Sequence, residues 1–227
     1  MSKILIACEE SQEVCKAFRA KGHEAYSCDL QECSGGHPEW HIQKDCLVVM
    51  YSEHWDLCIG HPPCQYLTNA GIGYFNEERY GGKAKVRAFY RQQALNFFMA
   101  MYNAPIDRIC LENPVGYVNH IIRPSQVIHP YYFGDPHKKR TCLWLKGLPQ
   151  LQWRKQPDLF GCVTAVPEPQ PLSVQVRKPG KHYKGGELKP RYYTDVFGGS
   201  KNSAKLRSKT FPSIAQAMAD QWGNINI

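Results

Sequence analysis

The sequence predicts an α/β protein with a doubly wound, mostly parallel sheet of the Rossmann type. Three observations predict it. Short apolar runs typical of buried strands recur along the first two thirds of the chain, at Lys3–Ala7, Glu24–Asp29, Asp56–Gly60, Arg108–Glu112 and Thr141–Lys146. Helical patterns lie between several of these runs, an alternation that is typical of parallel sheets. Two of the runs lead into proline-containing loops with reactive side chains, at the strand ends where such sheets bind ligands.

The first three predicted elements form a strand–helix–strand unit. The strand Lys3–Ala7 is followed by a helix over residues 11–21, for which Ser11 is the expected N-cap and Gly22 the stop. The strand Glu24–Asp29 ends in an acid. An acid at this place in a β-α-β unit can accept hydrogen bonds from ribose hydroxyls, so the unit predicts a nucleotide-type site.

The strongest chemical signal lies in Asp56–Gly71, with the sequence DLCIGHPPCQYLTNAG. Its two prolines end the strand, because proline cannot donate to a sheet ladder and favours an extended residue before it. Cys64 is thereby expected on a stiff loop at a strand end. A free cysteine is more often a small buried hydrophobic residue. The catalytic interpretation is favoured by Ile109–Gly116 (ICLENPVG), a second strand end that carries Glu112, because a thiol and an acid can act as nucleophile and proton donor.

These two stretches resemble motifs of the C5-cytosine DNA methyltransferases, in a short form of phage or bacterial restriction–modification type. GHPPCQYLTNAG is similar to the family's Pro-Cys nucleophile motif and LENPVG to its Glu-Asn-Val acid motif, in the expected order. The resemblance implies a class I methyltransferase fold, S-adenosylmethionine as methyl donor and DNA as substrate. It also implies that Cys64 adds to C6 of cytosine, which makes C5 reactive toward the methyl group.

The resemblance assigns further residues to the substrate. Glu112 would hold a proton at the N3 edge of the base, as a buried carboxyl can. Lys138 and Arg140 align with the two basic residues of the family's Gln-x-Arg-x-Arg motif, and a guanidinium can clamp the base carbonyl. A basic surface hairpin is the alternative for this segment. The other expected substrate contacts near the nucleophile are Gln65, Asn113 and Pro114.

The resemblance also implies a cofactor site. Asp29 and Leu30 take the positions that hold ribose and adenine, and Asp45 that of the acid that binds the adenine amino group. The family's glycine-rich first loop is replaced by ACEESQ at residues 7–12. Amides at the start of the following helix were therefore expected to take the methionine carboxylate, with Glu9 or Glu10 facing the positive charge of the cofactor. The full set of expected contacts is Cys8, Ser11, Asp29, Leu30, Asp45, Pro62 and Thr210.

The net charge of +8 comes entirely from residues 151–212, which hold twelve basic and four acidic residues; the other 16 of the 28 basic residues are balanced by the other 16 of the 20 acids. Aromatic residues lie between these cations, and the combination suits a phosphate backbone with stacked bases. A merely solvated face is the alternative. The family has its target-recognition region here, and the expected substrate contacts are Lys181, Lys184, Lys189 and Arg191.

Three parts of the chain are expected: residues 1–150 for cofactor binding and catalysis, 151–206 as a small basic recognition segment, and 207–227 as a helix that packs back on the catalytic part.

The chain has no apolar run of eighteen residues and no signal-peptide layout, and its ten cysteines include no CxxC pair. A monomeric cytoplasmic protein with reduced cysteines is therefore expected. The C-x3-H-x3-H-x4-C spacing of Cys33–Cys46 fits no common zinc module, so no metal is expected.

Two other functions remain open from the sequence. One is an amino-methyltransferase, whose Pro-Pro-aromatic loop serves an exocyclic amine without a covalent intermediate; it leaves Glu112 and Arg140 without a role. The other is a non-catalytic nucleic-acid-binding protein that keeps the scaffold, which the altered first loop and the short recognition segment favour.

Overall fold

The structure is a computed structural model that describes residues 1–153, 166–176, 179, 185–191 and 209–223. The chain divides into two compact units. The first consists of Met1–Ile128, Arg140–Leu151 and Ala215–Ile227, and the second of His129–Lys139 and Gln152–Ile214. Each is described by itself below.

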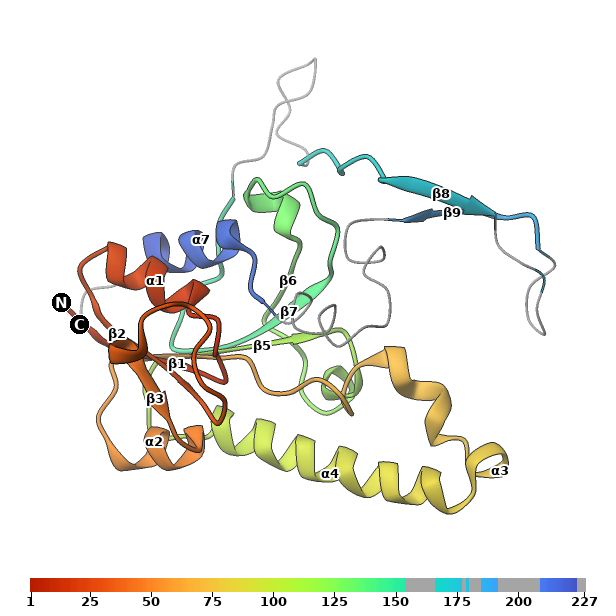
Figure 1. The fold of residues 1–227 in the computed structure, drawn as a ribbon, viewed down its shortest axis with the longest axis horizontal. Coiled ribbons are helices and arrows are strands. Elements are labelled where there is room, and N and C mark those ends of the chain that lie inside the picture. Colours follow the sequence, from red (N-terminus) through yellow and green to blue (C-terminus); the bar gives the residue numbers. More distant parts are fainter. Residues whose placement is uncertain (154–165, 177–178, 180–184, 192–208, 224–227) are drawn as a thin grey trace. The chain divides into compact units, whose positions relative to one another are not determined.

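The first unit contains a seven-stranded sheet with the strand order β3-β2-β1-β4-β5-β7-β6 (Figure 1). The neighbours from β3 to β5 pair in parallel, and β7 runs antiparallel to both β5 and β6. The predicted α/β class with a mostly parallel sheet is thus confirmed, and the arrangement is compatible with a Rossmann-like fold. The strands are β1 (Lys3–Ala7), β2 (Glu24–Asp29), β3 (His41–Gln43), β4 (Leu57–Gly60), β5 (Ile109–Pro114), β6 (Gln126–Ile128) and β7 (Thr141–Lys146).

Helices cover both faces of this sheet. Figure 1 shows α1 (Glu13–Ala20) and α7 (Pro212–Trp222) on one face and α2 (Cys46–Ser52) and α4 (Gly82–Tyr102) on the other. The Trp222 indole N–H donates to the Pro149 carbonyl at 3.0 Å, which fixes the end of α7. No helix in the described ranges combines the length and the apolar character that a membrane span requires. The short helices of the chain are η1 (Pro38–Trp40), η2 (Asn69–Phe75), α3 (Glu77–Tyr80), η3 (Tyr117–His120) and η4 (Pro130–Phe133). In the second unit, β8 (Ser173–Val176) and β9 (Leu188–Arg191) pair with each other in an antiparallel, two-stranded sheet.

The core follows from strand alternation. Successive side chains of a strand point to opposite faces, and both faces of β1 are buried because helices cover each of them. Leu5 and Ala7 belong to the main apolar cluster, together with Cys58, Phe98 and Met101. Nearly continuous burial explains why β1 and most of β7 appear as apolar runs; these strands and β2 were predicted with their observed bounds.

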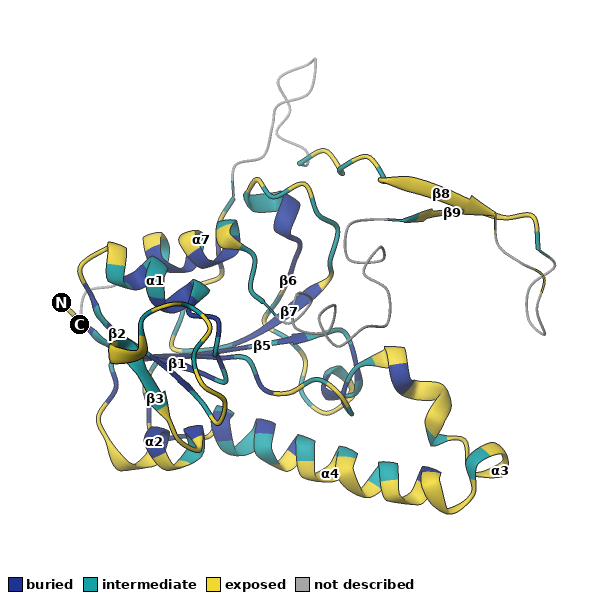
Figure 2. Cartoon of the chain, viewed as in Figure 1, coloured by how far each residue is buried: buried dark blue, intermediate teal, exposed yellow. Residues whose placement is uncertain are grey.

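Apolar side chains recur at helical spacing over residues 83–102, a pattern that predicts a long helix with this apolar stripe in the core. The helix is present as α4, but the prediction that the whole stripe is core is wrong. Val86, Phe89 and Tyr90 instead lie exposed, at 56%, 60% and 47% of their surface. Figure 2 shows the buried residues of α4 concentrated toward the end at Tyr102. The start of α4 therefore extends beyond the sheet that it was expected to cover.

Candidate active site

The predicted reactive residues follow strands that end at the same edge of the sheet. In the strand register Ala7 is paired with Gly60, and Gly60 with Leu111. Cys8 and His61 therefore follow the ends of β1 and β4 at the level of Glu112, which lies within β5. β1 lies between β2 and β4, which makes this the place where the strand order reverses. Ligands of open α/β sheets bind in the crevice at such a point.

Three contacts join residues 61–68 after β4 to residues 113–117 at the end of β5. From their predicted roles we call these segments the nucleophile loop and the acid loop. The buried Asn113 amide donates to the Pro62 carbonyl at 2.7 Å. The Tyr117 N–H donates to the Leu67 carbonyl at 2.6 Å, and Thr68 forms an isolated bridge with Gly116. Asn113 was expected to contact substrate, but its amide donates to the backbone of the nucleophile loop. The two predicted motifs therefore form a single block.

Gly116 makes this close approach possible. A Cβ atom at this position would lie 2.0 Å from the Leu67 carbonyl oxygen, which no side chain can tolerate without a backbone shift. Glycine is therefore required by space here, since its backbone is extended rather than left-handed. The glycine of LENPVG is thus explained by the contact between the loops.

Cys64 occupies the turn of the nucleophile loop. Its carbonyl accepts hydrogen bonds from the Leu67 and Thr68 amides at 3.0 Å each, which fixes the backbone beside the thiol. Cys64 is half-buried, whereas Cys58 and Cys110 on the neighbouring strands are fully buried and their thiol pKa values are raised by that burial. None of the nine cysteines in the described residues forms a disulfide. Cys64 is therefore partly accessible on a fixed backbone.

Glu112 faces His61, a residue that the sequence interpretation missed. The His61 Nδ1 and a Glu112 carboxylate oxygen lie 3.3 Å apart, and the two side chains are 9% and 15% exposed. The His61 Nε2 is buried and has no hydrogen-bond partner within the described residues. A neutral imidazole that accepts from a protonated carboxyl, and an imidazolium beside a carboxylate, both fit this distance. The pair can therefore hold one proton between its two members. In the sequence, the only signal for His61 was its position directly after a predicted strand.

Arg140 lies at the same sheet edge, and Lys138 belongs to the other unit. Thr141 pairs with Pro114 in the register of β7 and β5, so Arg140 emerges where the acid loop begins. Its charge partly offsets the burial that raises the pKa of the Cys142 thiol. Lys138 forms an ion pair with Glu168 in the second unit.

The loop after β1 adopts a backbone that favours glycine although it contains none. Cys8 and Gln12 both have a φ of 59°, in the left-handed region. Gln12 is fully buried, and its amide donates to the Ser27 hydroxyl at 3.2 Å and to the His37 carbonyl at 2.8 Å. The Cys8 thiol lies 3.6 Å from the Cys46 sulfur, and this contact together with burial raises its pKa. Buried hydrogen bonds thus hold the conformation that glycines would adopt freely.

Two expectations for this loop were wrong, and Glu9 is the reason. Its carboxylate accepts from the Val14 amide at 2.8 Å and the Cys15 amide at 3.2 Å, so Glu9 caps α1. Ser11 is buried but is not the N-cap, which is Gln12. The amides expected to take a cofactor carboxylate are therefore occupied by Glu9. Burial raises the pKa of Glu9, and the nearby His61 partly offsets this rise.

The remaining expected cofactor residues of the first unit lie along the same edge. The side chain of Asp29 accepts from the Gln31 amide, and that of Asp45 caps α2 by accepting from the Leu47 amide, both at 2.9 Å. Leu30 is 73% exposed beside Asp29. Pro62 follows β4 in the joined block. This edge offers carboxylates for hydroxyl or amino groups next to an exposed apolar side chain.

The other expected residues lie in the second unit or outside the described part. Thr210 is half-buried just before α7, Lys189 is a residue of β9, and the half-buried Arg191 ends that strand. Lys181 and Lys184 lie outside the described residues. Of the residues with zinc-like spacing, His41 lies 2.9 Å from both the Ser27 hydroxyl and the Gln31 carbonyl. Within the described residues no group of three or more metal-binding side chains is assembled.

No protein-family model matches the chain, and none of the curated proteins does. Evidence about function therefore comes from the residues at this sheet edge.

Proposed function

We propose that the chain is an S-adenosylmethionine-dependent methyltransferase that modifies C5 of cytosine in DNA through a covalent adduct with Cys64. The observation that carries this proposal is the block in which the nucleophile loop is joined to the acid loop by the Asn113–Pro62 hydrogen bond and the close approach at Gly116. A covalent mechanism needs thiol and acid in a fixed relation. The mostly parallel sheet is compatible with the methyltransferase fold that the motifs imply.

In the proposed reaction each residue of the block has a separate task. The Cys64 thiolate forms a bond to C6 of cytosine, and electron density moves onto the ring toward C5 and N3. Glu112 stabilises the developing charge at N3 with its proton, and His61 holds that carboxyl at 3.3 Å. Arg140 binds the base carbonyl through its guanidinium. After C5 has taken up the methyl group, water accepts the C5 proton and the electron pair left at C5 re-forms the C5–C6 double bond. The bond between C6 and the Cys64 sulfur breaks in the same step, which returns the thiolate.

The loop after β1 and the strand ends beside it fit S-adenosylmethionine as cofactor. The left-handed backbone at Cys8 and Gln12 lets the loop turn tightly at the crevice. Asp29 and Asp45 would accept hydrogen bonds from hydroxyl and amino groups, and Leu30 would cover an apolar face. When bound, the cofactor supplies the methyl group. Because Glu9 occupies the helix amides, we expect other groups to bind its methionine end.

The test is trapping with an oligonucleotide that contains 5-fluorocytosine, in the presence of S-adenosylmethionine. The fluorine blocks proton loss at C5, so we expect a denaturation-resistant complex with the nucleotide on Cys64 by peptide mass spectrometry. Cys64→Ser should form none while its cofactor affinity, measured by calorimetry, stays within a few-fold. Cys33→Ser, which alters another half-buried thiol, is the matched control and should trap normally.

The rival functions give different results in the same assay. An amino-methyltransferase would methylate the oligonucleotide without a trapped complex, and Cys64→Ser would retain its activity. A non-catalytic nucleic-acid-binding protein would bind the oligonucleotide and show neither product. Either result overturns the proposal.

A further inference from the structure

The start of α4 and the elements before it expose an unusual number of rings. Exposed large side chains of this region include Ile72, Tyr74, Val86, Phe89 and Tyr90, each between 47% and 62% accessible. The far half of the same helix buries Leu95, Phe98 and Met101. A cluster of exposed apolar side chains on one element marks a binding surface.

Three of these side chains, Tyr74, Val86 and Tyr90, line a cavity of about 400 Å³, here called the tyrosine groove. Tyr66 and Tyr90 are stacked at its wall with ring centroids 5.4 Å apart. As far as the chain is described, cations line the groove and acids do not. The side chains that define it are Tyr66, Tyr74, Tyr80, Lys83, Arg87 and Tyr90.

The groove is attached to the nucleophile loop by Arg87. Its guanidinium carbon lies 5.1 Å from the Tyr66 ring centroid and 5.4 Å from that of Tyr74, and an N–H group donates to the Gln65 carbonyl at 3.4 Å. Tyr66 follows Cys64 by two residues. The groove therefore begins beside the candidate nucleophile and is held in a fixed relation to it.

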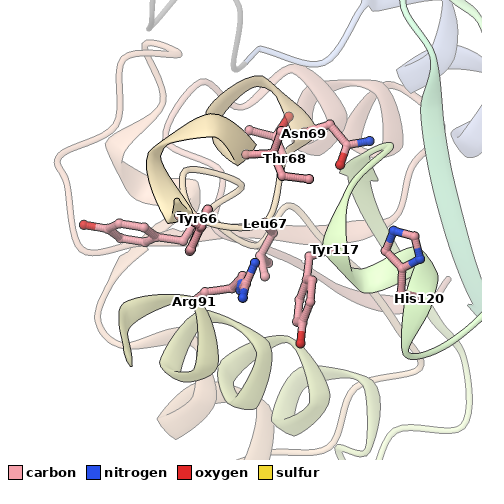
Figure 3. A pocket seen from close by; sticks show the side chains of 9 residues that line it. Tyr66, Leu67, Thr68, Asn69, Arg91, Tyr117 and His120 are labelled. Carbon is pink, nitrogen blue, oxygen red and sulfur yellow. The ribbon is translucent and has the colours of Figure 1, made fainter. Parts of the chain in front are cut away.

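A second cavity, of about 250 Å³, adjoins the groove, because Tyr66 lines both (Figure 3). Arg91 lies there between two rings, 4.0 Å from the Phe75 centroid and 4.2 Å from that of Tyr117. Figure 3 shows Arg91 and Tyr117 directed toward each other beside Leu67 and Thr68. Alternating guanidinium groups and rings thus extend from the loops of the block onto α4.

We propose that the tyrosine groove binds unpaired nucleotides of the DNA strand next to the target cytosine, which makes single-stranded or locally opened DNA the preferred substrate. This inference rests on the proposed function. Exposed tyrosine rings provide faces on which bases stack, and Lys83 and Arg87 provide charge for the phosphates. Paired bases present their edges rather than their faces, so stacking on these rings selects unpaired nucleotides.

The charge of the groove argues against a second copy of the chain as its occupant. In a two-fold dimer the same patch faces itself, so Lys83 and Arg87 would meet their own copies. A polyanion matches this charge instead.

The experiment measures binding of labelled oligonucleotides by fluorescence anisotropy, with one sequence as a single strand and as a duplex. The variant is Tyr74→Ala/Tyr90→Ala, whose side chains are 55% and 47% exposed. We expect it to lose about tenfold or more of its single-strand affinity, and less of its duplex affinity. Tyr74→Phe/Tyr90→Phe keeps the rings and should bind like the wild type. Tyr51→Ala on α2, 52% exposed, is the matched control and should also be unchanged.

Several results would overturn the inference. Unchanged affinity of the alanine variant is one, and an equal loss for single strand and duplex is another. Failure of the wild type to bind any oligonucleotide is a third. A wild-type dimer that becomes monomeric in the alanine variant, in sedimentation velocity, would assign the groove to self-association.

The trapping assay separates this inference from the proposed function. If the wild type binds the single strand through the groove but never forms the Cys64 complex, the proposed chemistry fails and the groove remains a binding site. If trapping succeeds and the alanine variant binds normally, only the groove inference fails. We expect trapping of the alanine variant at saturating oligonucleotide, because the two rings lie outside the reacting group.

Discussion

The loop after β4 and the loop after β1 follow neighbouring strands of the sheet. Different interactions fix the backbone conformation of each loop. The loop after β4 has a recognisable motif, and prolines and contacts with the acid loop hold it. The loop after β1 lacks the expected glycines. It keeps a left-handed backbone at Cys8 and Gln12 through buried hydrogen bonds and the Glu9 cap. A motif reports side-chain chemistry, whereas a loop conformation can be maintained by residues that no motif describes.

Glu112→Gln should have the largest effect, because it changes the loop pair to which we assign the proposed chemistry. The amide cannot hold the proton of the Glu112–His61 pair, so we expect the methylation rate to fall by on the order of 10² to 10⁴. Thermal unfolding should be little changed, because glutamine occupies the same space. A variant as active as the wild type would reduce the LENPVG resemblance to a structural one.

Gly116→Ala should break the contact between the two loops. The new Cβ would lie 2.0 Å from the Leu67 carbonyl oxygen, so the loops must separate, at a cost of about 1–3 kcal/mol in the free energy of unfolding. Activity should fall further than stability, since Cys64 loses its fixed relation to Glu112. Gly73→Ala is the control, because a Cβ there meets nothing within 4 Å. Equal denaturation midpoints in urea for both variants would contradict this explanation.

Gln12→Ala should release the fixed backbone conformation of the loop after β1, as Gly116→Ala does for the other loop. It leaves the His37 carbonyl and N–H without their Gln12 partner and removes one hydrogen bond of the Ser27 hydroxyl, so we expect a loss of about 1–3 kcal/mol in the free energy of unfolding. Cofactor affinity measured by calorimetry should weaken, with trapping of Cys64 intact at saturating cofactor. Gln92→Ala, on the exposed side of α4, provides the comparison. A Gln12 variant with normal cofactor affinity would separate this loop from the cofactor site.

Glu9→Gln should have the smallest effect on activity, and its test is the pH dependence of stability; the variant also loses one of the two acceptors that cap α1, a constant loss at every pH. Burial raises the pKa of Glu9 above 4.5, so the folded protein keeps this proton at a pH where the unfolded chain has lost it. The wild-type free energy of unfolding should therefore fall as pH rises from about 4.5 through the raised pKa, and then level off. The variant should lack this contribution in urea titrations across pH, whereas Glu32→Gln, at an exposed position, should retain it. Parallel pH profiles for Glu9→Gln and the wild type would exclude a raised pKa.

The sequence predicted the elements whose signal is local. β1 and most of β7 are apolar runs, β2 is a short run between Gly22 and an acid, and α4 and α7 carry a helical pattern. β3 was missed because three half-exposed residues give no period. The N-cap of α1 was misassigned because local rules favour a serine beside the helix, whereas the N-cap position is Gln12 and the side chain that accepts from the first helix amides is Glu9.

Prediction of the site was limited by contacts between distant segments. Cys64 and Glu112 were predicted as site residues because their neighbours form motifs, and their catalytic roles stay predictions. His61 and Gly116 act through partners about fifty residues away, at Glu112 and Leu67, which become neighbours only in the folded sheet. The exposed rings of α4 have the spacing of a core stripe, so periodicity alone assigned them to the interior.

The close approach at Gly116 also determines whether the protein loop or the substrate base has to move for the reaction. A nucleophile loop that is joined to its neighbour cannot swing toward a base without disturbing the end of β5. In the proposed reaction the cytosine has to travel to the thiol, and the energy of unstacking it falls on the nucleic acid. The loops in turn lose little entropy when substrate arrives, because their order is established during folding.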